Sequence, residues 1–362
     1  MLKSARGWAR SAGAGKARGW ARSAGAGKAR GWARSAGAGK ALRKPKKKRA
    51  LRVFFATDVH GSDVCFRKFL AAAKVYEADV LLLGGDFAGK GLVPVLRNGD
   101  GSLRTEIDGN QVNAPADGWD QLTADINRRG FYAAQMQPGE LAGLREDPAA
   151  RDRLFREEIA AQAKRWCRLA AERLDPAVRC IITPGNDDPV DADPVYAADE
   201  RVEFPSGTVC DLGPVVMASL GVVPFTPWST ERECSEEDLA KLIAEMLDSL
   251  PEGRPCIMNF HCPPYASGLD DAPELDATLK PVIRGGRPSI VPVGSHAVRD
   301  AIKKYQPPVS LHGHIHESRG VQRIGRTLCV NPGSDYSSGV LRGAVVDIAE
   351  DGSCLDFLLT TG

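Results

Sequence analysis

The most constraining feature of this chain is a series of five short apolar runs, each of which breaks off into Gly, Pro or polar residues. These runs and the residues that end them occupy 53–60, 80–86, 181–188, 257–261 and 309–316. Short apolar runs between turn residues predict buried strands. Ligands of open α/β sheets bind outside the carboxyl ends of the strands. We therefore expect the polar residues at these five strand ends to meet in one crevice.

Seven polar residues at these strand ends are suited to hold metal ions. They are Asp58, His60, Asp86, Asn186, His261, His314 and His316. The Asp-x-His and Gly-His-x-His spacings each let two ligands face one cation, and Gly313 lets the backbone approach closely. Seven ligands exceed those of one tetrahedral zinc ion and suit two metals about 3.5 to 4 Å apart that share a carboxylate. Imidazole with carboxylate favours Mn, Fe, Zn, Co or Ni over Ca or Mg.

Each of these residues alone has a structural alternative, because a single Asp more often caps a turn and a single His more often forms hydrogen bonds in the core. The metal interpretation depends on five such elements in order, each at a strand end. Two further histidines lie outside the pattern. We expect His312 to be packed or paired within its strand, and His296 to lie in the first turn of a helix.

The charge of such a centre indicates its substrate. Two divalent cations and two aspartates leave a net charge of about +2, or about +1 with a bridging hydroxide. A phosphoryl group would bind there through its non-bridging oxygens, and the metal-bridging hydroxide would attack in line. The metals would stabilise charge that builds on the equatorial oxygens.

These ordered blocks resemble those of the calcineurin-like metallophosphoesterases: Asp-x-His, Gly-Asp, Gly-Asn-His-Asp/Glu, a lone His and Gly-His-x-His. The resemblance covers roughly residues 51 to 345. It implies an α/β fold of two packed mixed β-sheets flanked by helices, a four-layer sandwich. It also implies one metal held by Asp58, His60, Asp86 and His316, and a second held by Asp86, Asn186, His261 and His314, with Asp86 bridging. Residues 331–334, Asn-Pro-Gly-Ser, resemble the closing turn of the family's smaller prokaryotic phosphodiesterase branch.

One block departs from the family pattern, because Asp187 stands where the family usually has a histidine. Two nearby cations would lower the pKa of this carboxyl. The group would then be a poor general acid, and its negative charge would repel a phosphate dianion. A diester carries one negative charge fewer, and family members without the histidine resemble diesterases. We therefore expect a phosphodiesterase. Asp187 would orient the substrate. As an equal alternative, it would not contact the metals but would orient His60 or a water.

The charge of the chain is segregated. Residues 1–50 contain 16 Lys or Arg and no Asp or Glu, so residues 51–362 contain 32 basic and 46 acidic residues, a net charge of −14. The basic segment holds three copies of a 12-residue repeat that begin at Ala5, Ala17 and Ala29, and a basic cluster at 44–49. We expect residues 1–50 to be a disordered basic repeat tail. A nucleic-acid arm, a targeting sequence and a nuclear-localisation cluster are alternatives for parts of it.

Residues 51–362 are predicted to form the metallophosphoesterase domain. We expect strands at 52–57, 79–84 and 178–183, helices at 63–76, 150–173, 235–248 and 296–305, and three or four strands within 321–359. The segment at about 91–174 is predicted to be an inserted hairpin and helix that shapes the pocket.

The sequence thus predicts a cytoplasmic, dinuclear metal-dependent phosphoester hydrolase, with manganese favoured, that acts on a small-molecule phosphoester or nucleotide. A nuclease that holds nucleic acid through the basic tail alone, and a non-catalytic metal-binding scaffold, are the alternatives. Nine scattered cysteines without a C-x-x-C pair indicate reduced thiols, and Cys262 is expected to fill space near the site. No apolar run is long enough to span a membrane. The oligomeric state and the substrate itself are not indicated.

Overall fold

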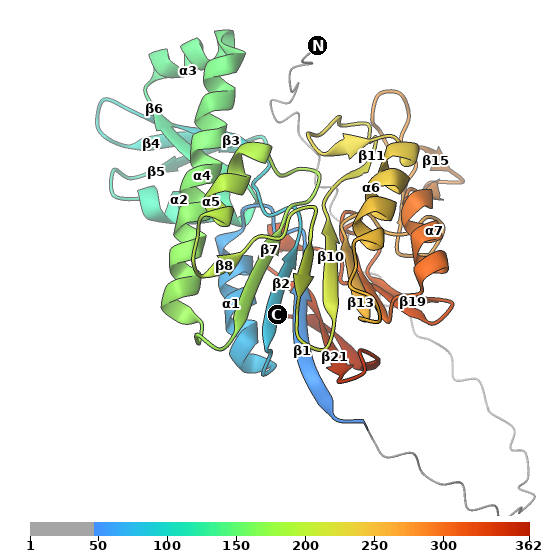
Figure 1. Cartoon of the computed structure of the whole chain (residues 1–362). Helices are drawn as coiled ribbons and strands as arrows, with labels where there is room; N and C mark the ends of the chain where they lie inside the picture. The colour runs from blue at the N-terminus through green and yellow to red at the C-terminus, as the bar shows by residue number, and fades with distance from the viewer. Residues whose placement is uncertain (1–46) are drawn as a thin grey trace, which may run out of the picture.

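The computed structural model of the chain describes residues 47–362. The repeats and most of the predicted basic tail lie outside this range. Two six-stranded mixed sheets pack face to face, and helices cover their outer faces (Figure 1). This confirms the predicted fold class. Among the described residues, no helix combines the length and the apolar character that a membrane span requires.

The first sheet contains the strands that precede three of the predicted ligand blocks. Its order is β22 (Cys354–Thr361), β21 (Arg342–Ala349), β1 (Arg49–Ala56), β2 (Val80–Gly84), β7 (Arg179–Thr183) and β8 (Val202–Glu203). Strands β1, β2 and β7 are adjacent and parallel, with Ala56 opposite Leu83 and Gly84 opposite Thr183. Their carboxyl ends therefore lie side by side at one edge of the sheet.

The second sheet contains the strands that precede the other two blocks. Its order is β19 (Gly320–Ile324), β20 (Thr327–Asn331), β18 (Val309–Leu311), β13 (Cys256–Phe260), β10 (Val216–Leu220) and β9 (Val209–Asp211). Strands β10, β13 and β18 run parallel. The predicted C-terminal strands thus divide between the sheets: β19 and β20 join the second, whereas β21 and β22 form an antiparallel edge of the first.

Three apolar layers hold this sandwich together. Residues such as Phe55, Leu82 and Ile257 fill the space between the two sheets. The outer face of the first sheet packs on α1 (Asp63–Val75), α4 (Pro148–Arg173) and α5 (Asp193–Ala197), and that of the second packs on α6 (Glu236–Asp248) and α7 (His296–Tyr305). Strands covered on both faces are typical of parallel sheets, and this explains why their sequences are continuous apolar runs.

The segment between β2 and β7 forms a small sheet and three helices. Its elements are β3 (Leu92–Arg97), β4 (Leu103–Ile107), β5 (Asn110–Ala114), α2 (Trp119–Arg128), β6 (Tyr132–Met136) and α3 (Pro138–Glu146), followed by α4. The expected hairpin is present as the antiparallel pairs β3–β4 and β4–β5. The parallel pairing of β6 with β3 was not predicted. A separate apolar cluster that includes Val95, Leu103 and Ile126 stabilises this unit.

Short elements complete the described part of the chain. Three two-stranded pairs are β11 (Val223–Pro224) with β12 (Glu233–Cys234), β14 (Asp271–Pro273) with β17 (Ile290–Pro292), and β15 (Ile283–Arg284) with β16 (Arg287–Pro288); the 3₁₀ turns are η1 (Val190–Ala192) and η2 (Tyr336–Ser338). Serine side chains cap the starts of α1, α6 and α7, where Ser62, Ser235 and Ser295 each accept a hydrogen bond from a backbone N–H three residues later. These caps agree with the predicted helix starts.

Candidate metal centre

The two sheets are joined at their carboxyl ends by direct hydrogen bonds. His261, which follows β13 of the second sheet, lies with its Nδ1 3.1 Å from the carbonyl oxygen of Gly84 at the end of β2. The backbone N–H of His314 donates to both carboxylate oxygens of Asp58, at 3.2 and 3.1 Å. Residues from strands far apart in the sequence therefore share one small volume.

One group of ligand atoms lies around Asp58. His316 Nε2 is 3.2 Å from Asp58 Oδ1, and His60 Nε2 is 3.1 Å from His316 Nε2 and 3.9 Å from Asp58 Oδ1. Atoms bound about 2.0 to 2.2 Å from one cation are roughly 3 to 4 Å apart. The three side chains therefore have the separation that a shared metal ion requires, and they belong to the set predicted for the first metal.

A second group lies around Asp86. His261 Nε2 is 3.4 Å from Asp86 Oδ1, and the ligand atoms of Asp86, His261 and His314 all lie within 4.8 Å of one another. The other oxygen of Asp86, Oδ2, is 3.7 Å from His60 Nε2 in the first group. Asp86 thus directs one carboxylate oxygen at each group, which is the arrangement of a bridging ligand.

Unpartnered polar atoms support the fit of cations to these residues. Asn186 donates its amide N–H groups to Thr230 Oγ1 at 3.0 Å and to Asp187 Oδ1 at 3.2 Å, which leaves its oxygen directed elsewhere. That Oδ1 and the Nε2 of His261 are buried and have no hydrogen-bond partner among the described residues. A buried polar atom without a partner is unfavourable by about 1 to 3 kcal/mol. A metal ion would satisfy both atoms.

The backbone at the site is strained. Asp58, His60, Asp86 and His314 have φ values of 53°, 39°, 52° and 66°. A side chain other than glycine is disfavoured in this left-handed region, and each such residue is unfavourable by about 1 to 3 kcal/mol. Four of the seven predicted ligands have this conformation, so the fold tolerates local strain in order to direct these side chains inward.

Two glycines leave the space that the ligands occupy. A Cβ at Gly185 would lie 2.2 Å from Asp86 Oδ1 and 2.7 Å from His261 Nε2, and a Cβ at Gly313 would lie 2.4 Å from Asp58 Oδ2. These contacts are too close for any side chain. The glycines of the Gly-Asn and Gly-His blocks are therefore required by packing against the ligands.

The electrostatics of the cluster favour bound positive charge. Burial acts to lower the pKa of His261, but Asp86 and Asp58 outweigh it and raise that pKa to about 10. Burial acts to raise the pKa of Asp86, and His261 and His60 hold it well below its ordinary value. Burial lowers the pKa of His314 to about 4, which keeps this imidazole neutral. The carboxylates thus favour positive charge beside His261, and a metal cation would supply that charge.

Asp187 lies at the entrance of this cluster and is paired with a lysine. Its carboxylate forms an ion pair with Lys90, and its backbone N–H donates to Asp86 Oδ1 at 3.0 Å. Burial and the charge of Asp86 raise the pKa of Asp187, and Lys90 opposes them. Burial and the charge of Asp86 therefore oppose the lowering of the Asp187 pKa that we expect from bound cations. The hydrogen bonds of the carboxylate go to Lys90 and Asn186 rather than to His60.

Asp188, to which sequence analysis assigned no role, holds two ligand loops together. One carboxylate oxygen accepts from Ala88 N–H and the other from Gly185 N–H, each at 2.8 Å. Burial, followed by the charge of Asp86, raises the pKa of Asp188 to about 8. This buried side chain fixes the Gly-Asn turn relative to the loop of Asp86.

The segment at 91–174 forms hydrogen bonds that hold two of the ligand loops in place. Tyr132 of β6 accepts a hydrogen bond from Gly89 N–H at 2.8 Å and donates to Gln162 Oε1 at 2.6 Å. Gln162 of α4 then donates to the carbonyl oxygen of Gly61 at 2.7 Å. Gly61 follows His60, and Gly89 lies three residues after Asp86. The segment therefore positions two ligand loops, which sequence analysis did not predict because the contact crosses 101 positions.

We expect Gln162→Leu to lower the free energy of unfolding by about 2 to 4 kcal/mol, because it leaves the buried Tyr132 hydroxyl and Gly61 carbonyl without their partner. Gln135→Leu, at an exposed position of β6, is the control. Urea unfolding of the full chain measures both. An equal stability of the two variants would contradict the supporting role of Gln162.

The remaining expectations concern residues outside the cluster. His312 follows β18 directly, is buried, and its Nδ1 lies 2.8 Å from the carbonyl oxygen of Phe260. His296 begins α7 and stacks on Tyr265. The nine cysteines are free, and Cys262 is buried, with burial raising the pKa of its thiol. The predictions for His296, for the free cysteines and for the buried Cys262 are confirmed. His312 is buried and paired as expected, but it lies directly after its strand rather than within it.

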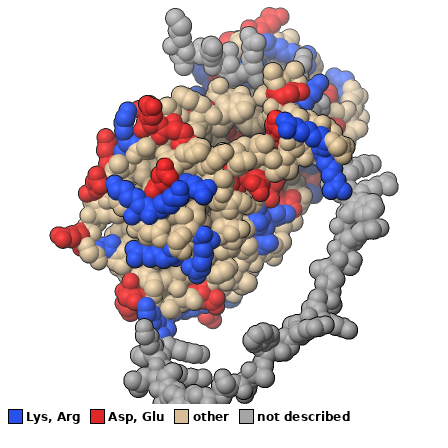
Figure 2. Space-filling model, turned by 90° about the vertical axis from the view of Figure 1, so that its right-hand side faces the viewer, with Lys and Arg blue, Asp and Glu red and all other residues tan. Residues whose placement is uncertain are grey.

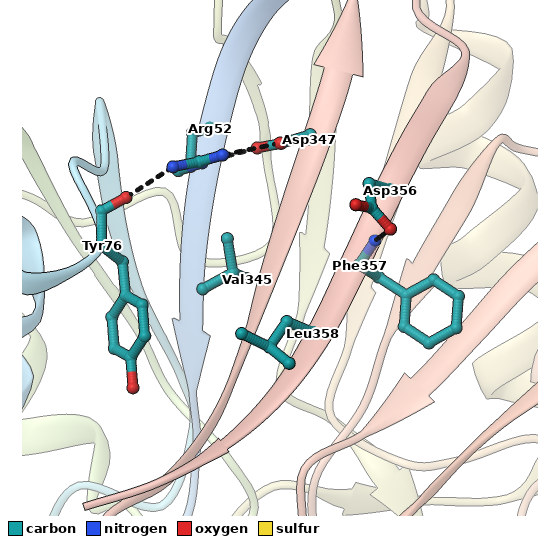
Figure 3. Close-up of a pocket in the computed structure, with 7 residues that line it drawn as sticks. All are labelled: Arg52, Tyr76, Val345, Asp347, Asp356, Phe357 and Leu358. Atoms are coloured by element: carbon teal, nitrogen blue, oxygen red, sulfur yellow. Dashed lines mark hydrogen bonds and ion pairs between the residues drawn. The ribbon is translucent and has the colours of Figure 1, made fainter.

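A separate cavity of about 160 Å³ lies on the outer face of the first sheet (Figure 3). Its lining is Arg52, Tyr76, Val345, Asp347, Asp356, Phe357 and Leu358. Arg52 donates to Asp347 at 2.7 and 2.8 Å and to the Tyr76 carbonyl at 2.9 Å. Arg52 is near the start of β1, whereas the ligands Asp58 and His60 follow its end. This cavity is therefore not part of the metal centre.

Comparison with known proteins supports the fold. No family profile matches the chain. Over 109 residues the chain is 29% identical to the uncharacterized protein MJ1162 of Methanocaldococcus jannaschii, and this match spans 30% of the chain but only 43% of that protein. A solved crystal structure aligns with 85% of this chain and 98% of its own, with a TM-score of 0.53 and 16% identity.

Two further solved structures are less similar. The protein TT1561 of Thermus thermophilus aligns with 86% of this chain and 98% of its own, with a TM-score of 0.46 and 14% identity. An archaeal phosphodiesterase aligns with 86% of this chain and 100% of its own, with a TM-score of 0.32 and 11% identity. At such identities a structural likeness concerns the fold alone, and the structure with a TM-score of 0.53 supports the packed α/β sandwich described above.

Proposed function

We propose that this protein is a dinuclear metal-dependent phosphoester hydrolase with a preference for phosphodiesters. The observation that supports this most is the carboxylate of Asp86, which directs Oδ1 at His261 and Oδ2 at His60. Asp58, His60 and His316 would complete one metal site with Asp86. Asn186, His261 and His314 would complete the other. Imidazole and carboxylate ligands favour Mn, Fe, Zn, Co or Ni, and we propose Mn.

Two such cations, when bound, would supply Lewis acidity and acidify a water at neutral pH. The chain's own residues set the conditions for this chemistry. Asp58 and Asp86 lie buried at the crossing of the two sheets and attract positive charge there. Asp188 and Thr230 hold the loop of Asn186 in place, and Gly84 orients the ring of His261 through its carbonyl oxygen.

The preference for diesters rests on the charge at the entrance. Asp187 adds a carboxylate beside Asp86, and Lys90 neutralises it. The entrance therefore offers less excess positive charge than a site with a neutral side chain at position 187. A monoester dianion therefore gains less electrostatic binding energy there than it would beside an uncharged residue. A diester monoanion carries half that charge, so its binding is less affected by Asp187.

The proposed partner is a small phosphoester or nucleotide rather than a nucleic acid bound by the folded body. Residues 51–362 have an excess of acidic groups. On the face shown in Figure 2, lysines and arginines are interspersed with aspartates and glutamates. Binding of a nucleic-acid backbone requires a continuous basic surface. A role of the basic tail in holding nucleic acid is tested by removal of residues 1–46, which end before β1. This removal should leave hydrolysis of small diesters unchanged, whereas a nuclease that depends on the tail should lose affinity for nucleic acid.

Hydrolysis of matched aryl mono- and diesters by the Mn²⁺-loaded protein tests this function. We expect turnover of both, with a higher kcat/KM for the diester. Faster turnover of the monoester would overturn the diester preference. Fewer than about two metal ions per chain together with no hydrolysis would favour a non-catalytic scaffold.

A further inference from the structure

A loop at 225–232, which joins β11 to β12, lies beside the second group of ligands (Figure 1). It follows the carboxyl end of β10, where the carbonyl oxygen of Leu220 accepts a hydrogen bond from the backbone N–H of His261 at 2.9 Å. Within the loop, Thr230 Oγ1 accepts a hydrogen bond from the amide of Asn186 at 3.0 Å. The loop therefore contacts directly a side chain whose oxygen we assign to a cation.

Hydrogen bonds to one carboxylate fix the conformation of this loop. Glu233 accepts from the backbone N–H and the hydroxyl of Thr226, at 3.0 and 2.6 Å. It also accepts from the backbone N–H and the hydroxyl of Thr230, at 2.8 and 2.5 Å. On the outside of the loop, Glu231 pairs with Arg156 of α4 at 2.6 Å. The loop is thus held both from within and by the inserted segment, so it presents its exposed side chains from a defined backbone.

Two large aromatic side chains of this loop are exposed to solvent. Phe225 is 72% exposed and Trp228 is 63% exposed, more than any other Phe or Trp within residues 47–362. Trp228 precedes Thr230 by two residues, so their Cα atoms are at most about 7 Å apart. Aromatic side chains that a fold leaves in water beside a cluster of convergent polar groups are typical of a ligand-binding site.

The surroundings of these two rings favour a small planar ligand. The arginines that contact the loop are engaged, because Arg156 pairs with Glu231, and Arg232 pairs with Asp193 at 2.6 Å. A lipid surface or a nucleic-acid backbone would require basic side chains that are free to contact phosphates. A stable contact between two protein chains involves about 20 to 30 residues on each side, far more than two exposed rings. A nucleobase, in contrast, stacks on one or two aromatic side chains.

We propose that Phe225 and Trp228 form a stacking surface for the nucleobase of a nucleoside-containing phosphodiester, whose phosphoryl group binds at the metal centre. This inference rests on the proposed phosphoester function and narrows its substrate class. The two rings contact a part of the substrate that does not react, so they bind the ground state and the transition state equally. Such binding lowers KM and leaves kcat unchanged. Phe225 and Trp228 are therefore specificity-determining residues, and Glu233 is a positioning residue that holds their loop.

The test uses two diesters that share a leaving group and differ in the nucleoside: the p-nitrophenyl ester of thymidine 5′-monophosphate, and methyl p-nitrophenyl phosphate. Full-length wild type, Trp228→Ala, Phe225→Ala and Trp228→Phe are compared after loading with Mn²⁺. The control is Phe357→Ala, at an aromatic residue that is 41% exposed on β22. We expect Trp228→Ala to raise KM for the nucleoside ester by about 5- to 100-fold, with kcat within about twofold of wild type. Its KM for the methyl ester should not change.

The other variants separate stacking from a structural role. Trp228→Phe should recover most of the affinity for the nucleoside ester, and Phe357→Ala should behave as wild type. Phe225→Ala gives an independent measurement of the same effect if Trp228→Ala does not fold.

Sedimentation velocity of the same proteins tests the contact between copies. An assembly that both alanine variants dissociate, with KM for the nucleoside ester within about twofold of wild type, would overturn the stacking role in favour of such a contact. An unchanged KM without any change of assembly would also overturn it, while hydrolysis by wild type stands. Failure of metal-loaded wild type to hydrolyse either ester would instead overturn the proposed function.

Discussion

Asp86→Asn is expected to abolish most of the hydrolytic activity, with a loss of roughly 10³-fold or more in kcat/KM. The substitution keeps the shape of the side chain but removes the charge that faces both ligand groups at once. We expect bound metal to fall from two ions to one or fewer, because an amide has a single oxygen and no charge to share between two cations. Kinetics with an aryl diester and elemental analysis measure the two effects.

The control for this variant is Asp300→Asn, at a carboxylate that is 75% exposed on α7. It should keep the activity and metal content of wild type. Far-ultraviolet circular dichroism establishes that both variants are folded. An Asp86→Asn protein that is folded and retains two metal ions with activity near wild type would show that Asp86 does not bridge metals, and the dinuclear proposal would fail.

Loading with Mn²⁺ is expected to raise the melting temperature of the protein by about 10 °C. At a free concentration of about 100 times the dissociation constant, each cation contributes about 2.7 kcal/mol, so two contribute about 5 kcal/mol. A change of this size shifts the melting temperature of a domain of a few hundred residues by about 10 °C. The physical reason is that the folded chain already holds strained, buried ligands that a cation satisfies, whereas the unfolded chain does not.

Thermal unfolding with added Mn²⁺, with Mg²⁺ and after treatment with a chelator measures this stabilisation. Mg²⁺ at the same concentration should stabilise less, because imidazole ligands suit it poorly. His261→Ala should lose part of the Mn²⁺ effect, because it removes one ligand of the second group. A melting temperature that Mn²⁺ and the chelator both leave unchanged would count against a metal site in the folded protein.

The helices and strands that were predicted have local signals, whereas α2, α3 and the central strand β10 were not predicted. The predicted helix at 296–305 matches α7, and the predicted strand at 178–183 differs from β7 by one residue. Parallel strands buried on both faces must be apolar throughout, and the turns after them must contain polar or small residues. The convergence of Asp58, Asp86, Asn186 and His261 was expected from the same rule, since ligands collect at the carboxyl ends of parallel strands.

The supporting contacts were not predictable, because they join segments with no shared pattern. The hydrogen bonds from Tyr132 to Gln162 and from Gln162 to Gly61 depend on how α4 and β6 pack behind the ligand loops. Lys90 lies four residues after Asp86 in the chain, but its partner Asp187 lies 97 residues away. A lysine in a loop is usually solvated, so its sequence position alone does not indicate a role.

The sequence by itself determined which residues end each strand and therefore which side chains were available to bind metal, because hydrophobic patterning and turn chemistry act over a few residues. Only the tertiary structure decided how those side chains face one another. The two sheets meet at an edge where Asp86 lies between two groups of histidines, and the insertion brings Lys90 to the entrance. These relations depend on the packing of whole layers, a long-range property that no local stretch of sequence encodes.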